Sequence, residues 1–558
     1  MVPSLSGHPA PYGVALIGEA LGEDEVTEGS PFVGRAGFKL TRLIEWAGLD
    51  RSRFDIWNAV WCRPPGNALE GTNYEFPSVD HCRAAHWGGL PARVKVLVPM
   101  GNVPLHALTG RKGILVARGY IEGGPGGTHI LPTVHPSFIQ RGQSKYSAAF
   151  IHDLQKAVEL AQTGLPIRPF SYVIDPSPMR AYEWAKEYRQ ELAADPSTRL
   201  AYDIETPGKE EDEGENRDED DPTYTIFRIG FSYRGYAGLT VPWTPPYMAA
   251  IRTCLESQGE KVVWNAGYDN PRIGAAGVAI NGLVHDGMVA WHVLHSDLPK
   301  GLRFVATFTC PWQPAWKHLS HASPGFYNCT DADVELRSME VIEAELKRTG
   351  LWDVYQSDVL DMEPILQHMH LRGMPIDAEI RLKRAIELAR RQSEELQALE
   401  EAVPLEARRV AIAYKETPKD LTGLRTRPGI RTRSFCPECG LVKPGKAHFR
   451  ILKKKVNPCG GLSPVNRDVE VEEYYRLADF KPSREQLIRY QQALGRVIPS
   501  TYDRKTKKRK YSMDEKSLKE LIRKYPDDKL YKGVLKYREL DKLAGTYIGR
   551  PVRNTENV

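Results

Sequence analysis

Three short acidic stretches, each placed where a strand or helix is expected, restrict the fold more than any other feature of the chain. They are Asp203–Thr206, Asn265–Asp269 and Tyr327–Asp331. The apolar runs Leu200–Tyr202 and Lys261–Trp264 precede the first two and are typical of buried strands. In the third stretch the tyrosine and the aspartate are four residues apart, so a helix would present both on one side. This order predicts an α/β domain with acidic groups gathered at one site.

Four carboxylates in these stretches suit a site for two divalent metal ions. Mg²⁺ and Mn²⁺ prefer hard oxygen ligands and retain open positions for a substrate phosphate. Two such ions can stabilise the attacking and leaving oxygens of a phosphodiester displacement. The alternative is that Asp-Ile-Glu is a solvated strand end, but three motifs in this order favour the metal site. The candidate ligands are Asp203, Glu205, Asp269 and Asp331.

This set resembles the proofreading 3′–5′ exonuclease domain of the DEDD type with a tyrosine in its third motif. The resemblance implies an RNase H-like α/β domain over residues 198–350 that acts on single-stranded 3′ ends of DNA. It also implies that Tyr327 orients the attacking water and that Asn265 contacts the substrate. The segment His285–Met288 resembles a further element of that domain, for which we expect a structural role.

Composition limits the compartment and the number of domains. A chain of 558 residues predicts about three or four domains, and 41% hydrophobic content is ordinary for a globular protein. No apolar run is long enough to span a membrane, and the first residues lack the pattern of a secretion signal. Eight cysteines do not form a dense disulfide framework. We expect the cytoplasm of a bacterial or phage-infected cell, with no membrane partner.

Residues 1–165 contain a second group of motifs in an α/β pattern. The buried-strand run Val14–Gly18 leads directly into glycine-rich sequence that extends to Gly37. Such a turn places side chains and backbone N–H groups at the carboxyl edge of a sheet, where α/β proteins bind ligands. Two further segments, Trp57–Pro65 and Thr133–Ser137, accompany it.

Together these motifs resemble the uracil-DNA glycosylase superfamily, in the branches whose first motif is Gly-Glu-Ala-Pro-Gly. Leu21 stands where those branches usually have proline. The resemblance implies a pocket for a flipped base and a wedge after the histidine that enters the minor groove. The resemblance implies that Glu25 positions or activates the water and that Glu19 lies in the same pocket. It implies that Phe32 stacks on the flipped base and that Asn58 reads its edge. His135 would donate a hydrogen bond to the departing uracil oxygen.

Those branches often hold an iron–sulfur cluster on four cysteines. Cys62 and Cys82 match the later pair, but no Cys-x-x-Cys precedes Val14. We therefore expect no cluster on this chain alone, and we interpret the two cysteines as buried thiols.

The rest of the chain resembles the thumb of family A DNA polymerases. A linker with a helix near Ser177 occupies residues 166–197, and residues 351–558 are largely helical in pattern, with a long helix over Ala378–Ala402. Arg372–Asp377 and Tyr537–Tyr547 carry the resemblance. It implies that the thumb grips duplex DNA and that Lys507, Lys508 and Lys510 contact its phosphates.

An inserted module at about residues 416–466 carries a zinc-type cysteine pattern. Cys436 and Cys439 form a Cys-x-x-Cys pair, Cys459 follows later, and His448 is a candidate fourth ligand. A structural zinc ion is one interpretation, and a reduced flexible loop is the other.

These expectations give a multidomain α/β protein: a glycosylase-like domain, an RNase H-like exonuclease and a helical thumb with a zinc-ribbon-like insertion. The sequence lacks a palm and fingers, so we do not expect it to polymerise DNA alone. The arrangement resembles the N-terminal portion of a split or truncated family A polymerase of phage-like type, with a separate palm and fingers subunit as partner. The alternative is a non-catalytic DNA-binding clamp, or a uracil-sensing accessory subunit for a polymerase.

Overall fold

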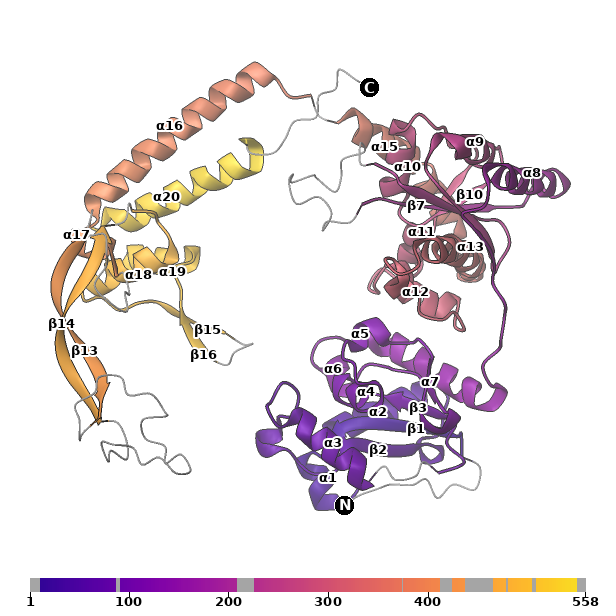
Figure 1. Cartoon of the computed structure of the whole chain (residues 1–558), viewed down its shortest axis with the longest axis horizontal. Coiled ribbons are helices and arrows are strands. Elements are labelled where there is room, and N and C mark those ends of the chain that lie inside the picture. The colour runs from indigo at the N-terminus through magenta and orange to yellow at the C-terminus, as the bar shows by residue number, and fades with distance from the viewer. Residues whose placement is uncertain are drawn as a thin grey trace, which may run out of the picture. The chain divides into compact units, whose positions relative to one another are not determined.

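The computed structural model describes residues 11–86, 91–207, 225–373, 375–411, 424–436, 465–477, 480–503 and 508–548. The chain divides into two compact units, residues Met1–Gly373 and Met374–Val558. Figure 1 shows both, and each is described here by itself. None of the helices in the described ranges combines the length and the apolar character that crossing a bilayer requires.

The first sheet of the N-terminal unit is a largely parallel sheet in the order β2-β1-β3-β5-β4. Its strands are β1 (Val14–Ala20), β2 (Asp55–Val60), β3 (Val96–Pro99), β4 (Glu122–Gly123) and β5 (His129–Ile130). Its helices are α1 (Glu23–Glu28), α2 (Arg35–Trp46), α3 (Glu75–His86), α4 (Asn102–Thr109), α5 (Ile114–Ala117), α6 (Pro136–Gln140) and α7 (Tyr146–Thr163).

The first part of strand β1, Val14–Ile17, is buried on both faces, which is why it is continuously apolar. Val14 and Leu16 join the core that contains residues of α2 and α7. Ala15 and Ile17, which point to the other face, join the core formed with α3 and α4. The glycosylase-like part is therefore a sheet between two helical layers (Figure 1).

The second sheet is mixed, in the order β11-β10-β7-β8-β9-β6. Its strands are β6 (Ser171–Ile174), β7 (Leu200–Glu205), β8 (Arg228–Ser232), β9 (Ala237–Pro242), β10 (Lys261–Val263) and β11 (Val284–Asp286). Its helices are α8 (Pro178–Ala194), α9 (Met248–Leu255), α10 (Ala266–Ala275), α11 (Gly287–Leu294), α12 (Leu302–Thr309), α13 (Pro324–Arg348), α14 (Trp352–Val354) and α15 (Glu363–Arg372).

Strand β7 places the first acidic stretch by simple alternation. Tyr202 and Ile204 pack into the core shared with α8, α9 and α10. Ala201 faces the opposite core, which contains residues of α13. Because successive side chains of a strand alternate, Asp203 and Glu205 share the face of Ala201 and lie toward α13. That is the helix that carries the third acidic stretch.

The segment expected as a linker contributes to this sheet. Strand β6 pairs in parallel with β9 at the sheet edge. Helix α8 begins at Pro178 with Ser177 as its N-cap, as the sequence predicts, and the serine hydroxyl accepts from the backbone N–H of Arg180.

The two α/β parts of this unit meet through a buried polar contact. Arg118 and Asp153, both almost fully buried, form an ion pair with an N–O distance of 3.0 Å. The same guanidinium donates to Thr307 of α12. It also lies over the rings of Phe304 and Phe308, at 4.5 and 5.1 Å from their centroids. Helix α12 thus packs against the glycosylase-like part through a desolvated arginine.

The C-terminal unit is a helical domain with antiparallel strands. Its helices are α16 (Ala378–Ala402), α17 (Leu405–Arg408), α18 (Arg484–Ala493), α19 (Glu515–Lys524) and α20 (Lys529–Leu543). Its strands are β12 (Arg409–Ala411), β13 (Arg425–Phe435), β14 (Val465–Leu477), β15 (Ser500–Asp503) and β16 (Lys508–Tyr511). Strand β13 lies within the predicted insertion at about residues 416–466, and it pairs in antiparallel fashion with β14.

The helix boundaries in this unit agree with the sequence patterns, except at the start of α19. Helix α16 spans the predicted Ala378–Ala402, and Ser483 caps α18. The sequence Ser512-Met513-Asp514-Glu515 fits a capping box that would begin a helix at Ser512. In the structure Asp514 is the N-cap of α19 and accepts from the backbone N–H of Ser517. A carboxylate beside the helix N-terminus also interacts favourably with the helix dipole.

Candidate functional site

The motifs of the glycosylase-like part converge on one cavity of about 730 Å³ at the carboxyl edge of the first sheet. Parallel strands end at the same edge, so residues far apart in sequence meet there. All five residues predicted for this pocket line it: Glu19, Glu25, Phe32, Asn58 and His135. The sequence did not single out Arg63, Glu70 and Arg141, which also line the cavity.

Phe32 is held in the cavity wall by an unusual backbone. Its φ is +56°, a left-handed conformation that non-glycine residues rarely adopt. Its backbone N–H donates to Glu25, whose other carboxylate oxygen accepts from Gly22 at 2.5 Å. Glu25 therefore fixes the loop between Gly22 and Phe32. The role of Glu25 in water activation stays a prediction.

Gly18 leaves the space that Phe32 and Asn58 occupy. A Cβ on Gly18 would lie 2.3 Å from Asn58 Oδ1 and 2.4 Å from Phe32 Cζ. Such distances require one of the two side chains to move, so this strand position admits no side chain while both stay in place.

Gly18→Ala should therefore reduce uracil excision by roughly 10- to 100-fold, since overpacking costs about 1–3 kcal/mol. Excision is measured as alkali-sensitive cleavage of a uracil-containing oligonucleotide. Gly123→Ala is the matched control, because no atom lies within 4 Å of its added Cβ. Equal activity of the two variants would contradict this account of Gly18.

Asn58 brings an unpartnered amide to the same cavity. The side chain is 4% exposed, and its Nδ2 has no hydrogen-bond partner within the described residues. An unsatisfied buried amide costs free energy, so its retention indicates a partner that enters from outside. The exocyclic oxygen of a pyrimidine is such a partner.

His135 is held as a neutral imidazole whose tautomer is set by its neighbour. Its Nδ1 accepts from the backbone N–H of Ser137 at 3.2 Å and lies 2.8 Å from the Ser137 hydroxyl. Burial, with Arg141 nearby, lowers the pKa of His135 to about 4. A neutral ring that accepts at Nδ1 carries its proton on Nε2 and can donate there. Its ring centroid lies 5.8 Å from that of Phe32.

This lowered pKa predicts a pH dependence of stability. The unfolded histidine binds a proton near pH 6.5 and the folded one only near pH 4, so stability is lost as pH falls between these values. From pH 7.5 to pH 5 the loss attributable to His135 should be at most about 2 kcal/mol. Chemical unfolding of the wild type and of His135→Gln at both pH values measures it. Identical pH dependence in the two proteins would contradict a depressed pKa.

Glu19 differs from Glu25 in its surroundings. Burial raises the pKa of Glu19, and the nearby carboxylate of Glu70 raises it further. Glu19 is thus a carboxyl of the pocket with a raised pKa. It lines the same cavity as the residues that we expect to contact the base.

Cys62 and Cys82 interact with each other, but only Cys82 is buried. The expectation of two buried thiols is therefore wrong for Cys62, which is exposed. Within the part of the chain that the structure describes, no histidine, cysteine or carboxylate joins them in a group able to hold a metal. The pair does not supply the ligands of a four-cysteine cluster.

The acidic stretches bring three carboxylates together between β7 and α13. Ligand atoms of Asp203, Glu205 and Asp331 all lie within 4.8 Å of one another. Asp203 accepts from the side-chain amide of Asn328 at 2.7 Å, and Asn328 Oδ1 in turn accepts from the hydroxyl of Thr240. Asn328 thereby fixes the orientation of Asp203, a role that the sequence did not reveal.

Two further carboxyls belong to the same electrostatic cluster. Asp269 on α10 is 4% exposed, and its proton affinity is affected by Glu205 and Asp331. It lies outside the three-carboxylate group. Glu335, one turn after Asp331 on α13, is 1% exposed, and its Oε2 has no partner among the described residues. The sequence analysis missed Glu335.

Asp203, Glu205 and Asp269 bind protons more tightly than usual. Burial and the neighbouring Asp331 raise the pKa of Glu205 to about 8. Burial, together with Asp331 and Glu205, raises the pKa of Asp203 well above its usual range. Burial also raises that of Asp269. Like charges at such separations cannot all ionise without a compensating cation.

The donor set fits hard divalent cations. Asp203, Glu205 and Asp331 offer carboxylate oxygens within one coordination sphere, and Glu205 Oε1 is buried without a partner within the described residues. Oxygen-only sites of this kind suit Mg²⁺ or Mn²⁺.

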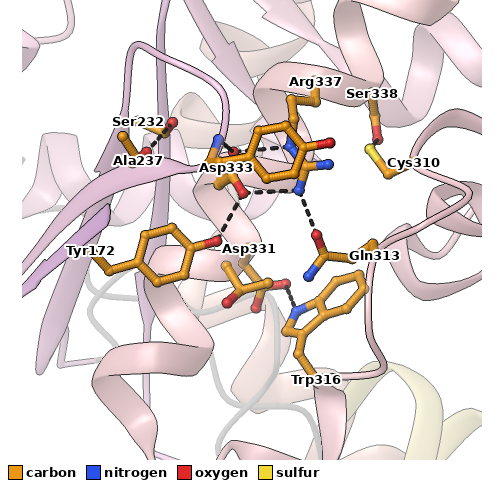
Figure 2. Close-up of polar contacts among 12 residues, drawn as sticks. Tyr172, Ser232, Ala237, Cys310, Gln313, Trp316, Asp331, Asp333, Arg337 and Ser338 are labelled. Atoms are coloured by element: carbon orange, nitrogen blue, oxygen red, sulfur yellow. Dashed lines mark hydrogen bonds and ion pairs between the residues drawn. The ribbon is translucent and has the colours of Figure 1, made fainter. Parts of the chain in front are cut away.

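Asp331 is also contacted by a loop between α12 and α13. Trp316 Nε1 donates to Asp331 Oδ1 at 2.8 Å, and Lys317 Nζ lies 2.6 Å from the same oxygen (Figure 2 shows the tryptophan contact). Lys317 also donates to the hydroxyl of Tyr327 at 3.1 Å. Both loop residues were missed by the sequence analysis.

Asn265, in the second acidic stretch, and Asp286 both lie at the start of a helix. Asn265 is exposed and begins α10 with φ +77°. Asp286 accepts from the backbone N–H groups of Asn265, Ala266, Met288 and Val289. Asp286 thus fixes the starts of α10 and α11, in keeping with the structural role expected of His285–Met288. The substrate contact of Asn265 stays a prediction.

Several candidates in the C-terminal unit lie outside the described residues. These are Cys439, His448, Cys459 and Lys507. Cys436 is buried, Lys508 lies on β16, and Lys510 on the same strand is exposed. Zinc binding and phosphate contact stay predictions.

Comparisons with known proteins match the N-terminal part. The profile of the Uracil DNA glycosylase superfamily matches residues 7–158. A Type-4 uracil-DNA glycosylase of Thermotoga maritima is 33% identical over 149 residues, which are 26% of this chain and 75% of that protein. A Type-4 uracil-DNA glycosylase of Saccharolobus solfataricus is 58% identical over 55 residues, which are 10% of this chain and 26% of that protein.

Among solved structures, the POL domain of Pol1 from M. smegmatis in complex with DNA primer-template and dNTP aligns with a TM-score of 0.39 and 13% identity. The alignment covers 68% of this chain and 49% of that one. This score is too low to establish a shared fold. The glycosylase match is stronger, since it covers three quarters of the Thermotoga protein and the matched family region includes the cavity residues. The chain therefore belongs to the uracil DNA glycosylase superfamily through its N-terminal domain.

Proposed function

We propose that the N-terminal domain excises uracil from DNA. The observation that carries the proposal is the convergence of Phe32, Asn58 and His135 on one cavity, with the Asn58 amide unpartnered among the described residues. A flipped uracil would stack on Phe32 and be read by Asn58. His135 would donate from Nε2 to the uracil oxygen that gains negative charge as the bond between base and sugar breaks.

A neutral histidine suits this task. The base leaves as an anion, water adds to the sugar carbon, and a hydrogen bond from Nε2 stabilises the developing charge. A pKa near 4 keeps the imidazole neutral across the physiological range. Glu25 fixes the loop that carries Phe32, and Glu25 or Glu19 is available to orient the water.

Alkali treatment of a uracil-containing oligonucleotide in EDTA tests this proposal. The wild type should produce cleavage at the uracil, while His135→Ala and Asn58→Ala should reduce it strongly. Gly123→Ala serves as the active control. Binding of uracil DNA without cleavage would instead support the uracil-sensing accessory protein.

We propose further that the second α/β part is a metal-dependent 3′–5′ exonuclease that proofreads DNA. Support comes from the group formed by Asp203, Glu205 and Asp331, with buried Asp269 beside it. These four residues would hold two Mg²⁺ or Mn²⁺ ions, which supply charge stabilisation at the phosphodiester. Tyr327 would orient the attacking water, and the mixed sheet with α13 against β7 supports the RNase H-like assignment.

The C-terminal unit would act as a polymerase-type thumb that holds duplex DNA, with Lys507, Lys508 and Lys510 as phosphate contacts. Its partner would be the palm and fingers of a family A polymerase. Co-purification with a palm and fingers subunit, followed by primer extension, tests this arrangement. A non-catalytic clamp is the alternative, and it predicts DNA binding without degradation of 3′ ends.

A further inference from the structure

Lys317 places a positive charge inside the acidic site. Its Nζ lies 2.6 Å from Asp331 Oδ1 and 3.1 Å from the hydroxyl of Tyr327. The side chain is 24% exposed. A lysine in this position contacts both a candidate metal ligand and the residue expected to orient water.

The segment that carries Lys317 is fixed to the fold. Trp316 is 1% exposed, donates to Asp331, and packs against Tyr120 with ring centroids 6.1 Å apart. Three residues earlier, Gln313 accepts from Arg337 at 2.6 Å (Figure 2). The contact of Lys317 with the site is therefore built into the packing.

The contacts that fix this segment involve two aspartates on opposite sides of α13. Asp331 and Asp333 are two residues apart on a helix and so face different directions. Asp331 accepts from Trp316, while Asp333 binds Arg337 at 2.9 Å and accepts from Tyr172 at 2.8 Å (Figure 2). Asp333 also accepts from the backbone N–H of Tyr236. The Arg337 guanidinium that binds Asp333 also donates to Gln313, so the loop that carries Lys317 is tied to α13 at two points.

These contacts restrict Asp331. Its Oδ1 accepts from both Trp316 and Lys317, so Oδ2 is the oxygen that remains available to a cation. The hydroxyl oxygen of Tyr327 accepts from Lys317, so the tyrosine proton is directed away from the lysine.

We propose that Lys317 is a positioning residue of the acidic site, which holds Asp331 as a one-oxygen ligand, directs the Tyr327 hydroxyl and weakens cation binding by its own charge. This inference rests on the proposed exonuclease function. It differs from that function in predicting opposite changes in two quantities when the ammonium is removed: tighter metal binding and slower cleavage.

The test uses the full chain and the variants Lys317→Met, Lys317→Arg and Lys347→Met. Lys347 is an exposed lysine of the same domain, paired with Glu343, and is the matched control. Calorimetric titration with Mn²⁺ in the absence of DNA measures cation binding. Single-turnover degradation of a 3′-labelled oligonucleotide at saturating Mn²⁺ measures the cleavage rate.

Lys317→Met should bind Mn²⁺ at least about tenfold more tightly, because an adjacent positive charge is lost. Its rate at saturating Mn²⁺ should fall about 10- to 100-fold, because Tyr327 and Asp331 lose their positioning donor. Lys317→Arg should keep wild-type Mn²⁺ affinity, since it keeps the charge, and Lys347→Met should match the wild type in both measurements.

Unchanged Mn²⁺ affinity or an unchanged saturated rate in Lys317→Met would overturn the proposal. If the wild type binds Mn²⁺ but degrades no DNA, the exonuclease function fails, and with it the positioning of Tyr327 for catalysis. A wild type that degrades DNA, combined with a Lys317→Met variant that behaves identically, leaves the nuclease intact and rejects only the role of Lys317.

Discussion

Asp203→Ala should lower 3′–5′ degradation of single-stranded DNA by roughly 10³-fold or more, which corresponds to about 4 kcal/mol of transition-state stabilisation. A carboxylate oxygen of Asp203 lies within 4.8 Å of carboxylate oxygens of both Glu205 and Asp331. Its removal would deprive the site of one of the carboxylates that would hold the metal ions. The measurement is single-turnover degradation of a 3′-labelled oligonucleotide with Mg²⁺.

The same substitution should not unfold the protein. Asp203 is surrounded by other carboxyls that raise its pKa, so its loss relieves repulsion in the metal-free state. We expect Asp203→Ala to keep or raise the metal-free melting temperature and to keep uracil excision. A variant that loses both activities together with its thermal stability would contradict this separation of roles.

Arg118→Met should destabilise the N-terminal unit by about 3–5 kcal/mol, because it leaves a buried carboxylate without its partner. Asp153 is 0% exposed and accepts from two sources, the Arg118 guanidinium and the hydroxyl of Thr133. The variant also removes the donor to Thr307 of α12. Urea unfolding followed by tryptophan fluorescence measures the shift.

The double variant Arg118→Met, Asp153→Leu is the control for this prediction. When both charges are replaced by apolar side chains, the buried carboxylate that lacked its arginine is also removed, so much of the lost stability should return. If the single and double variants unfold at the same urea concentration, the ion pair is not what stabilises this contact. Since Thr133 precedes His135 by two residues, the single variant should also lower uracil excision.

Local sequence pattern predicted the elements well where the pattern itself determines the structure. The apolar run at Val14 gave β1, and the alternation in β7 explains why Asp203 and Glu205 share a face. The Ser177–Pro178 pair and the charged helix at Ala378 were also found where expected. Each of these signals lies within a few residues of the element it specifies.

The features that were missed depend on tertiary contacts. Nothing near Lys317 in the sequence indicates that it reaches Asp331, because the contact is produced by the packing of Trp316 and Gln313 against α13. Strand β6 pairs at a sheet edge with a partner more than sixty residues away, so its short sequence carried no signal. Cys62 was assigned to the interior from its residue type, yet it follows the end of β2 and is exposed.

Asn328 shows an intermediate case. It lies inside the third acidic stretch, but its role depends on its contact with Asp203, 125 residues earlier. The residue could have been suspected, since a helical position next to Tyr327 is close to the site. Its amide orientation, with Nδ2 toward Asp203 and Oδ1 toward Thr240, requires the structure.

One experiment tests most directly whether this chain carries both a uracil-excising pocket and a metal-dependent nuclease. An oligonucleotide with one internal uracil and a 5′ label is incubated with the full chain in EDTA or in Mg²⁺, and half of each sample is treated with alkali. We predict alkali-dependent cleavage at the uracil in EDTA, absent in His135→Ala, and progressive shortening from the 3′ end in Mg²⁺, absent in Asp203→Ala. An intact oligonucleotide in every lane, despite DNA binding, would contradict the account and favour a non-catalytic clamp.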